Sequence, residues 1–317
     1  MDEVIVLGGG VIGLTTAVVL AERGHPVRVW TREPARDTVS AVAGGLCWPY
    51  RIRPERTAAR WAVASLRTFT GLAGDPARTG VRMATGVLVR PWMPEPWASC
   101  VDARRPGPGE LPGGEDPDSA VRATTALIDM PSYLRYLRDR LTDAGGHHER
   151  RAVRSPAEAG TAAPAVVNCT GLGARELVPD PRVRPVQGRL VIVENPGVEE
   201  WYVAAEPGSP DSTYLLPQPY GLVLGGTAQD GAEDLGPDPA ATEAIVRRCA
   251  RIDPRVLGAR VLGVRTGLRP FRPNVRLERE DLPGGAVCVH QYGHGGAGVT
   301  VSWASATAAA DLLGASA

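Results

Sequence analysis

The sequence predicts an α/β protein in which one domain is discontinuous and a β-rich α+β domain is inserted into it. A strand–helix–strand pattern of about 30 residues, the size of a β-α-β unit, opens the 317-residue chain. A strand, a glycine loop and an Ala-rich helical pattern close the chain. Short alternating runs between these ends indicate strands that no helices separate. The two ends are therefore expected to belong to one domain.

The N-terminal segment has the pattern of a dinucleotide-binding loop. Val4–Leu7 is a short apolar strand, Gly8-x-Gly10-x-x-Gly13 follows it, and Leu14–Glu22 has the pattern of a helix. In a Rossmann unit the first glycine permits the tight turn, the second lets the backbone approach a pyrophosphate, and the third allows close helix packing. The phosphates then bind the free N–H groups at the positive end of the helix.

The segment after this helix supports the same interpretation. Val27–Trp30 alternates as a second strand, and Glu33 lies about 20 residues beyond the glycines, where an acid bonds the ribose hydroxyls. Arg32 is an equal candidate for contacting the adenosine. The motif alone does not separate NAD from FAD, and a glycine-rich turn without a ligand is the alternative.

The rest of the chain contains further segments with helical and strand patterns. Pro131 stands near the start of one predicted helix, where proline is favoured. The segment 91–118 is rich in Pro, Gly and acids and is predicted to be an exposed, irregular loop. The further predicted helices are Ala58–Leu72, Met130–Leu141, Ala240–Ile252 and Thr300–Leu313, and the further predicted strands are Ala165–Cys169, Arg189–Val193, Tyr214–Leu216, Leu222–Gly226 and Ala286–Val289.

The charged residues exclude several classes of function. All 35 basic residues are Arg, so neither a Schiff-base lysine nor a P-loop lysine exists, and pyridoxal-phosphate chemistry is excluded. The formal net charge is zero, which gives no electrostatic footprint for nucleic acid or an anionic membrane. No apolar run reaches the roughly 18 residues of a membrane span.

The cysteines and histidines predict neither disulfides nor a metal site. The five cysteines are widely spaced and form no C-x-x-C pair, which is typical of free thiols in a reducing compartment. No signal sequence is visible, and a cytoplasmic location is expected. His147 and His148 are adjacent, which is not a chelating spacing, and are expected in a surface loop.

Four motifs, taken together and in order, resemble the D-amino-acid oxidase family of FAD-dependent enzymes. They are Val42–Tyr50, Asn168–Gly171, Arg265–Pro270 and Gln291–Thr300. The last two are the most specific, and the resemblance spans nearly the whole chain. It implies an FAD-binding domain formed by residues 1–50, 133–181 and 263–317, and a substrate-binding domain formed by residues 51–132 and 182–262.

The resemblance also implies which residues hold FAD. The N-terminus of the last helix would stabilise the negative charge that reduced flavin carries near N1 and O2. The cofactor-binding residues implied are Gly8, Gly10, Val11, Ile12, Gly13, Thr31, Arg32, Ser40, Gly44, Gly45, Leu46, Val153, Thr170, Gly295, Gly298, Val299 and Thr300.

The substrate would be held by three groups. Arg269 would bind the carboxylate, for which its planar, always charged fork is suited. The Tyr214 hydroxyl would reach the same carboxylate, and the Gly296 carbonyl would accept from the amine. Trp48 and Tyr50 would line the pocket. The family transfers the α-hydrogen as hydride to flavin N5 without an essential side-chain base, and yields a 2-oxo acid, ammonia and hydrogen peroxide.

Two departures from the family pattern bear on the substrate. Pro210 stands where animal members carry a second tyrosine on a lid, which implies a reduced lid and an open site. Ala228 follows Gly-Gly-Thr, where members selective for acidic substrates carry an arginine. With no second cation evident, burial of a side-chain carboxylate is costly. We therefore expect neutral D-amino acids to be preferred over D-aspartate.

Other interpretations remain beside this one. They are a related flavin oxidase for glycine or sarcosine, a biosynthetic tailoring amine oxidase, an NAD-dependent dehydrogenase and a catalytically inactive flavin-binding module. The expected partners are the amino acid and O2, with a homodimer as one option. Arg265, Arg272, Arg276 and His294 are interpreted as structural residues.

Overall fold

The computed structural model describes residues 2–90, 95–107, 109–112, 115–204, 209 and 211–314. Within these residues thirteen strands form one continuous sheet, in the order β4-β3-β8-β9-β10-β7-β12-β13-β6-β1-β2-β5, with β11 pairing β7 beside this path. The strands are β1 (Val4–Leu7), β2 (Val27–Thr31), β3 (Val81–Val89), β4 (Ala120–Ile128), β5 (His147–Arg150), β6 (Ala165–Asn168), β7 (Arg184–Val193), β8 (Trp201–Ala204), β9 (Asp211–Gln218), β10 (Gly221–Thr227), β11 (Gln229–Asp230), β12 (Val261–Asp281) and β13 (Val287–His294).

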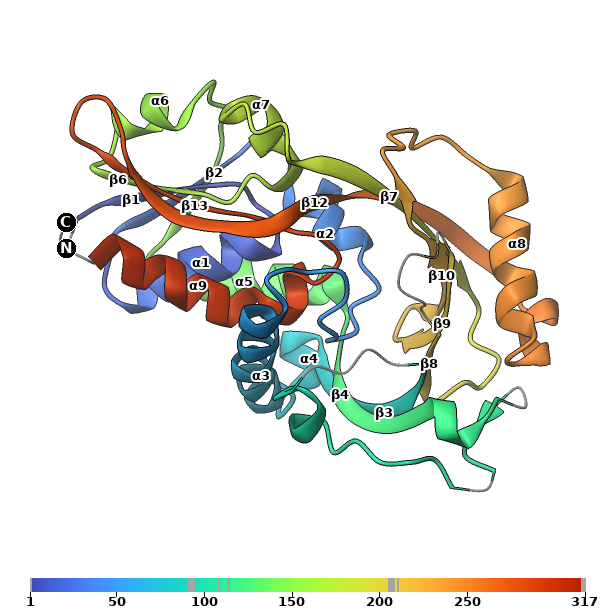
Figure 1. Cartoon of the computed structure of the whole chain (residues 1–317). Coiled ribbons are helices and arrows are strands. Elements are labelled where there is room, and N and C mark those ends of the chain that lie inside the picture. The colour runs from blue at the N-terminus through green and yellow to red at the C-terminus, as the bar shows by residue number, and fades with distance from the viewer. Residues whose placement is uncertain are drawn as a thin grey trace.

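Helices cover both halves of this sheet (Figure 1). None of the helices within the described ranges is long and apolar enough to cross a membrane. The α-helices are α1 (Val11–Glu22), α2 (Val39–Val42), α3 (Glu55–Leu72), α4 (Pro76–Thr79), α5 (Met130–Asp143), α6 (Pro156–Gly160), α7 (Ala174–Leu177), α8 (Pro239–Ala250) and α9 (Gly298–Gly314).

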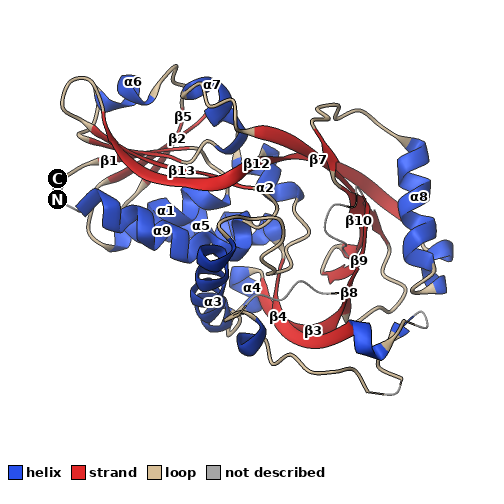
Figure 2. Ribbon diagram, in the orientation of Figure 1, coloured by secondary structure: helices blue, strands red, loops and turns tan. Residues whose placement is uncertain are grey.

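One half of the sheet has the parallel arrangement that the N-terminal pattern predicts. β1 lies between β2 and β6 and pairs both in parallel, while β13 extends the sheet beside β6. Alternate residues of β1 enter different cores, with Val4 and Val6 facing one core and Ile5 and Leu7 the other. Burial on both faces explains the continuous apolar run. α1, α5 and α9 lie together on one side of these strands (Figure 2).

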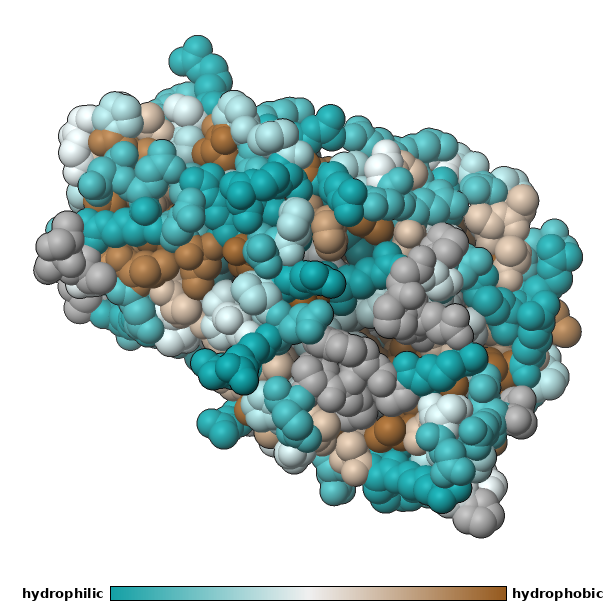
Figure 3. All heavy atoms as spheres, in the orientation of Figure 1, coloured by the Kyte–Doolittle hydropathy of each residue, from teal (hydrophilic) through white to brown (hydrophobic). Residues whose placement is uncertain are grey.

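The other half is mostly antiparallel and is covered on its outer side by α8 (Figure 2). Ile245 and Cys249 of α8 are buried against Val191 of β7 and Leu222 of β10. The hydropathy surface shows hydrophilic residues over most of one face of the molecule, with apolar residues in scattered groups (Figure 3). This pattern is ordinary for a globular protein surface.

Strand β12 joins the two halves. It pairs antiparallel with β7 from Val261 to Phe271 and with β13 from Phe271 to Asp281. The sheet therefore continues through the predicted boundary at residue 263. The division of the chain into an FAD-binding and a substrate-binding domain stays a prediction.

The predicted helices and strands are present, with ends that differ by a few residues, but parts of the pattern were missed. The sequence did not predict β3, β4, β5, β8, β11 and β12. The segment 91–118 is not wholly exposed, because Trp97 and Val101 are buried in the main core. The expectation that His147 and His148 lie in a surface loop was wrong, since both belong to β5, which pairs with β2.

Candidate active site

A cleft of about 1410 Å³ lies where the two halves of the sheet meet. It is larger than the usual small-molecule pocket, as a dinucleotide together with a substrate requires. Its lining comes from the N-terminal glycine loop, the segment 37–55, the ends of β6 and β13 and the residues around Tyr214 and Arg269. Every predicted site residue lines this cleft except Gly13 and Thr300.

The glycine loop is packed too closely for side chains. Gly8 has a φ of +111°, and a Cβ on it would lie 2.5 Å from the Cys169 carbonyl oxygen. A Cβ on Gly13 would lie 3.0 Å from the Gly8 carbonyl carbon and closer still to its oxygen. Gly13 therefore serves the loop by helix packing rather than by lining the cleft.

The start of helix α1 is open to an anion. Gly10 precedes the helix and provides no side-chain cap. Among the described residues, the side-chain hydrogen bond at the first turn comes from Ser40, whose Oγ accepts from the Val11 N–H at 2.9 Å. Gly10, Val11 and Ile12 line the cleft at this end, where the free N–H groups of a first turn and the positive end of the helix dipole favour an anion. These residues fit the pyrophosphate of a dinucleotide.

The residues predicted to meet the adenosine lie at the end of β2. Thr31 donates its hydroxyl to the Glu33 carbonyl at 2.7 Å, and Arg32 pairs with the Glu33 carboxylate at 2.9 Å. Val153 lines the same end of the cleft. The Arg151 guanidinium stacks 3.9 Å from the Trp30 ring centroid, which adds a flat, cationic wall that the sequence did not indicate.

The start of helix α9 is the second helix end at the cleft. A Cβ on Gly298 would lie 4.0 Å from Val11 and from Ile12, so the N-termini of α1 and α9 are neighbours. The Thr300 side chain turns away from the cleft, accepting from the Trp48 N–H at 2.9 Å and donating to the Trp48 carbonyl at 2.8 Å. Two adjacent helix N-termini favour an anionic group between them.

Thr170 and the segment 44–46 form the remaining predicted wall for the cofactor. The Thr170 hydroxyl donates to Asn168 Oδ1 at 2.7 Å, which fixes the turn after β6. The Gln218 amide donates to the Gly44 carbonyl at 2.9 Å, and Leu46 makes a bridge with Leu127 of β4. These contacts hold the wall against the second half of the sheet.

Arg269 and Tyr214 meet on the substrate side of the cleft. Arg269 Nη1 donates to the Thr227 carbonyl at 3.0 Å, and among the described residues no carboxylate lies within 4 Å of its guanidinium. Burial raises the pKa of Tyr214, and the nearby Arg269 charge opposes that rise. A guanidinium without an anion next to a protonated phenol is suited to bind a carboxylate.

The wall predicted to meet the substrate is aromatic and apolar. Trp48 is 8% exposed and makes an edge contact with Trp97, their ring centroids 6.0 Å apart. Tyr50 lies beside Gly296, where an added Cβ would be 3.1 Å from Tyr50 Cδ1. Leu216 and Ala228 also line the cleft. Pro210, where a reduced lid is expected, lies outside the described residues.

The expectation that no second cation lies near this site was wrong. Arg51 lines the cleft and shares a small side pocket with Arg269. Its guanidinium carbon lies 5.2 Å from the Tyr50 ring centroid, and Nη2 donates to the Ser209 carbonyl at 2.6 Å. No carboxylate among the described residues pairs with it. Nothing in a local sequence pattern marks an arginine that tertiary structure brings to a pocket.

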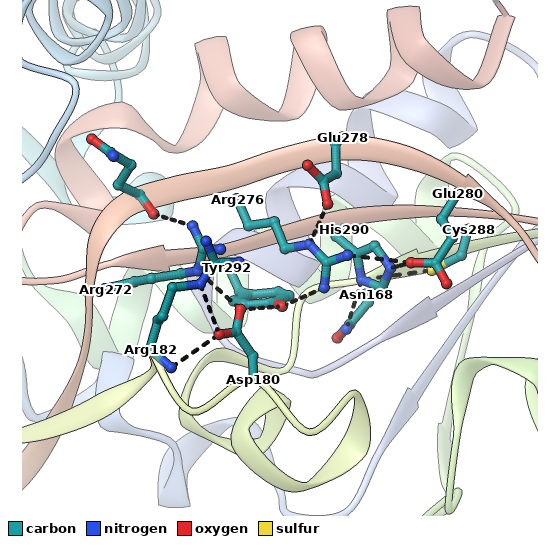
Figure 4. Close-up of polar contacts among 11 residues, drawn as sticks. Asn168, Asp180, Arg182, Arg272, Arg276, Glu278, Glu280, Cys288, His290 and Tyr292 are labelled. Atoms are coloured by element: carbon teal, nitrogen blue, oxygen red, sulfur yellow. Dashed lines mark hydrogen bonds and ion pairs between the residues drawn. The ribbon is translucent and has the colours of Figure 1, made fainter.

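The arginines interpreted as structural are engaged within the protein. Figure 4 shows Arg272 beside Asp180, whose Oδ2 accepts from Arg272 Nε at 2.9 Å and from the Tyr292 hydroxyl at 2.9 Å. Arg276 Nη1 donates to the same Tyr292 hydroxyl at 2.8 Å. Arg265 donates to the Ala41 carbonyl at 3.4 Å. Sequence reasoning missed Asp180, because nothing near it in the chain predicts its partners.

His294 also has a structural contact, through its backbone. Its carbonyl accepts from the Ala297 N–H at 3.1 Å, which shapes the glycine loop before α9. Burial lowers the pKa of its imidazole to about 4, so the ring is neutral at neutral pH. A role in the loop therefore suits this residue.

Comparisons with known proteins agree with this geometry. Residues 3–312 match the family model described as FAD dependent oxidoreductase. The chain belongs to this family. FAD is its cofactor, and the protein is an oxidoreductase. That FAD binds in the cleft with its two helix N-termini, and which residue contacts which part of it, remain predictions.

Two bacterial relatives match over nearly the whole chain. A D-amino-acid oxidase of Streptomyces coelicolor is 57% identical over 98% of this chain and 96% of its own length. A D-amino-acid oxidase of Rubrobacter xylanophilus is 50% identical over 98% of this chain and 95% of its own length. A human D-aspartate oxidase is 32% identical over 98% of this chain and 94% of its own length.

Solved structures share the fold. A glycine oxidase from Geobacillus kaustophilus has a TM-score of 0.80 at 20% identity, covering 99% of this chain and 94% of its own. An L-alpha-glycerophosphate oxidase from Mycoplasma pneumoniae, solved with FAD bound, has a TM-score of 0.78 at 14% identity, covering 99% of this chain and 95% of its own. These likenesses establish the α/β fold of the chain.

Proposed function

We propose that this protein oxidises D-amino acids with FAD and O2, yielding a 2-oxo acid, ammonia and hydrogen peroxide. The observation that carries the proposal is the Arg269 guanidinium beside Tyr214, without a carboxylate partner among the described residues and in the same cleft as the glycine loop. Held at the N-termini of α1 and α9, FAD would supply the two-electron redox chemistry, with O2 as the final electron acceptor.

The protein's own contribution is orientation. Arg269 donates two N–H groups to the substrate carboxylate, and the Tyr214 hydroxyl donates a third hydrogen bond. The Gly296 carbonyl accepts from the amine, so three groups of the protein orient the α-carbon. Trp48 and Tyr50 exclude water from the pocket. The D configuration rests on the two bacterial relatives, both named as D-amino-acid oxidases.

Neutral side chains are the proposed substrate class. Trp48, Leu216 and Ala228 offer the side chain apolar surface, and Ala228 brings no charge. Arg51 favours a second candidate class, the acidic D-amino acids, because it is a cation without a carboxylate partner among the described residues. The Arg51 guanidinium is engaged by Ser209 and the Tyr50 ring, which supports the neutral class.

An oxygen-consumption assay separates these classes. D-alanine, D-valine and D-methionine should be oxidised faster than D-aspartate and D-glutamate, with L-enantiomers, glycine and sarcosine far slower. Faster oxidation of the acidic pair, lost in Arg51→Leu, would instead establish the acidic class. Activity confined to glycine or sarcosine would reject the D-amino-acid proposal, and a colourless protein that gains no flavin spectrum with FAD would reject the cofactor.

The setting of the enzyme is a further part of the proposal. All five cysteines are free, and four of them are buried, which suits a reducing compartment such as the cytoplasm. We also propose the two-domain division given above and a homodimer. Sedimentation at micromolar concentration tests the homodimer, and a single species of about 33.4 kDa would reject it.

A further inference from the structure

We propose that Gly188 and Gly225 are positioning residues that set where Arg269 and Tyr214 hold the substrate. The inference rests on the proposed function, because it concerns the same carboxylate site. Gly188 belongs to none of the motifs described above, and Gly225 opens the Gly-Gly-Thr motif, which served only to locate Ala228. Both lie in strands of the sheet, where glycine is disfavoured unless another group approaches closely.

The order of four strands creates this arrangement. β9, β10, β7 and β12 are consecutive neighbours in the sheet (Figure 1). The outer two strands carry Tyr214 and Arg269, and the inner two carry Gly225 and Gly188. The two functional side chains therefore lean inward from the edges of this group, each over a glycine on the neighbouring strand.

Gly188 lies directly under the guanidinium. Arg269 is opposite Val186 and Gly267 is opposite Gly188, so Arg269 and Gly188 are diagonal neighbours on one face. A Cβ on Gly188 would lie 2.5 Å from Arg269 Cζ and Nη2, and closer still to Nη1. Real contacts of this kind are near 3.4 Å or more, so the guanidinium would have to move by about 1 Å.

Gly225 lies under the phenol in the same way. It is directly opposite Tyr214 in the β9–β10 pairing. A Cβ on Gly225 would overlap the Tyr214 ring and hydroxyl, and a Cβ on Gly226 would lie 2.6 Å from that hydroxyl. Because Gly188 and Gly225 have no β-carbon, the Arg269 guanidinium and the Tyr214 hydroxyl can lie close to the sheet. This leaves space above both donors for a carboxylate.

Alanine at position 188 separates a positioning role from a folding role. The backbone of Gly188 is not left-handed, so alanine adds no backbone strain, and the group that must move is the end of a flexible side chain. The variant should therefore fold and keep FAD while Arg269 is displaced. A displacement of this size at a bidentate site costs activity of the order of 10²-fold.

The experiment compares two substrates and a matched control. We expect Gly188→Ala to lower kcat/KM for D-alanine at least tenfold while changing kcat/KM for D-alaninamide, which has no carboxylate, less than threefold. Gly263→Ala, in β12 with no atom within 4 Å of the added carbon, should change neither. An unchanged preference for D-alanine over its amide in Gly188→Ala would overturn the proposal.

Two further measurements keep the result interpretable. Gly188→Ala in an Arg269→Ala background should have no additional effect on this preference, because both act through one guanidinium; additive effects would contradict the proposal. Titration of the flavin absorbance with propanoate reports the carboxylate site without turnover. Weaker propanoate binding in Gly188→Ala than in Gly263→Ala would support the inference, whether or not the protein oxidises amino acids. A lack of amino-acid oxidation would reject only the proposed function.

Gly225→Ala provides a second variant should Gly188→Ala fail to fold. It should displace the Tyr214 ring, raise the propanoate dissociation constant by about the same factor as Tyr214→Phe, and leave FAD bound. Gly225→Ala with unchanged propanoate binding would remove this glycine from the proposed role.

Discussion

The backbone of Trp48 and the hydroxyl of Thr300 exchange two hydrogen bonds across the cleft wall. The Trp48 N–H donates to Thr300 Oγ1 at 2.9 Å, and the hydroxyl donates back to the Trp48 carbonyl at 2.8 Å. Thr300 belongs to the first turn of α9, and Trp48 lines the cleft where the substrate is predicted to bind. The helix end proposed to meet the flavin and the wall proposed to meet the substrate are therefore fixed to each other.

Thr300→Val should loosen both sites at once. It keeps the shape of the side chain but leaves the Trp48 N–H and carbonyl without this partner, at a cost of about 1–3 kcal/mol. We expect weaker FAD binding, seen by fluorescence titration, together with a raised KM. Thr300→Ser keeps the hydroxyl and should behave close to the wild type. If Thr300→Val bound FAD and substrate as the wild type does, the hydrogen bonds between Thr300 and Trp48 would contribute to neither binding site.

Arg269 should dominate the binding of substrate. Arg269→Ala removes charge-assisted hydrogen bonds to the carboxylate, each worth about 1.5–3 kcal/mol. We expect kcat/KM to fall by about 10² to 10³-fold, mainly through KM, while the flavin absorbance spectrum is retained. Arg269→Lys should recover little, because an ammonium lacks the planar fork. Arg247→Ala, an exposed arginine of α8, is the control and should leave activity unchanged. A normal KM in Arg269→Ala would exclude it from the carboxylate site.

Tyr214 should remain a hydrogen-bond donor at alkaline pH. Burial favours the neutral phenol and raises its pKa above the usual 10, so the hydroxyl keeps its proton as the pH rises to that value. Below pH 10, the dependence of kcat/KM on pH should therefore be the same in the wild type and in Tyr214→Phe. Tyr214→Phe itself should raise KM about tenfold, the loss of one hydrogen bond to a charged group. A break below pH 10 present only in the wild type would show that the phenol ionises early.

The parts of the fold that the sequence predicted are those with a local signal. The glycine spacing before α1 and the apolar run of β1 are properties of consecutive residues. They were enough to predict the N-terminal β-α-β unit. β5 consists of His147, His148, Glu149 and Arg150, which carry no apolar alternation. Backbone pairing with β2 alone makes it a strand, and composition does not encode that pairing.

The candidate site divides in the same way. Arg269 and Tyr214 stand in recognisable motifs, so their positions were predictable by resemblance. Arg51 and Gly188 were not, because each becomes part of the site through strands and loops that are distant in sequence. Thr300 was predicted at the flavin, yet its hydroxyl is occupied by Trp48. Motif matching located the residues, but only the three-dimensional contacts assigned their partners.

The buried pair formed by Asp180 and Arg272 should make stability depend on acid pH. Burial raises the pKa of the Asp180 carboxyl, but hydrogen bonds from Tyr292, the Arg182 N–H and Arg272 outweigh it and hold the pKa at about 2. A carboxyl with a lowered pKa contributes stability above its unfolded value near 4, and this contribution of about 2 kcal/mol is lost as the pH falls from about 4 to 2.

Asp180→Asn tests this dependence by thermal unfolding. At pH 7 the variant leaves the buried Arg272 guanidinium without its anion, which costs about 3–5 kcal/mol, so its Tm should lie well below that of the wild type. The difference in Tm should shrink as the pH approaches 2, because the wild-type carboxyl is then protonated as well. Asp143→Asn, at a largely exposed ion pair, should show almost no difference at any pH. A gap for Asp180→Asn that stayed constant from pH 5 to pH 2.5 would mean that Asp180 does not titrate in this range, and that its contribution is packing rather than charge.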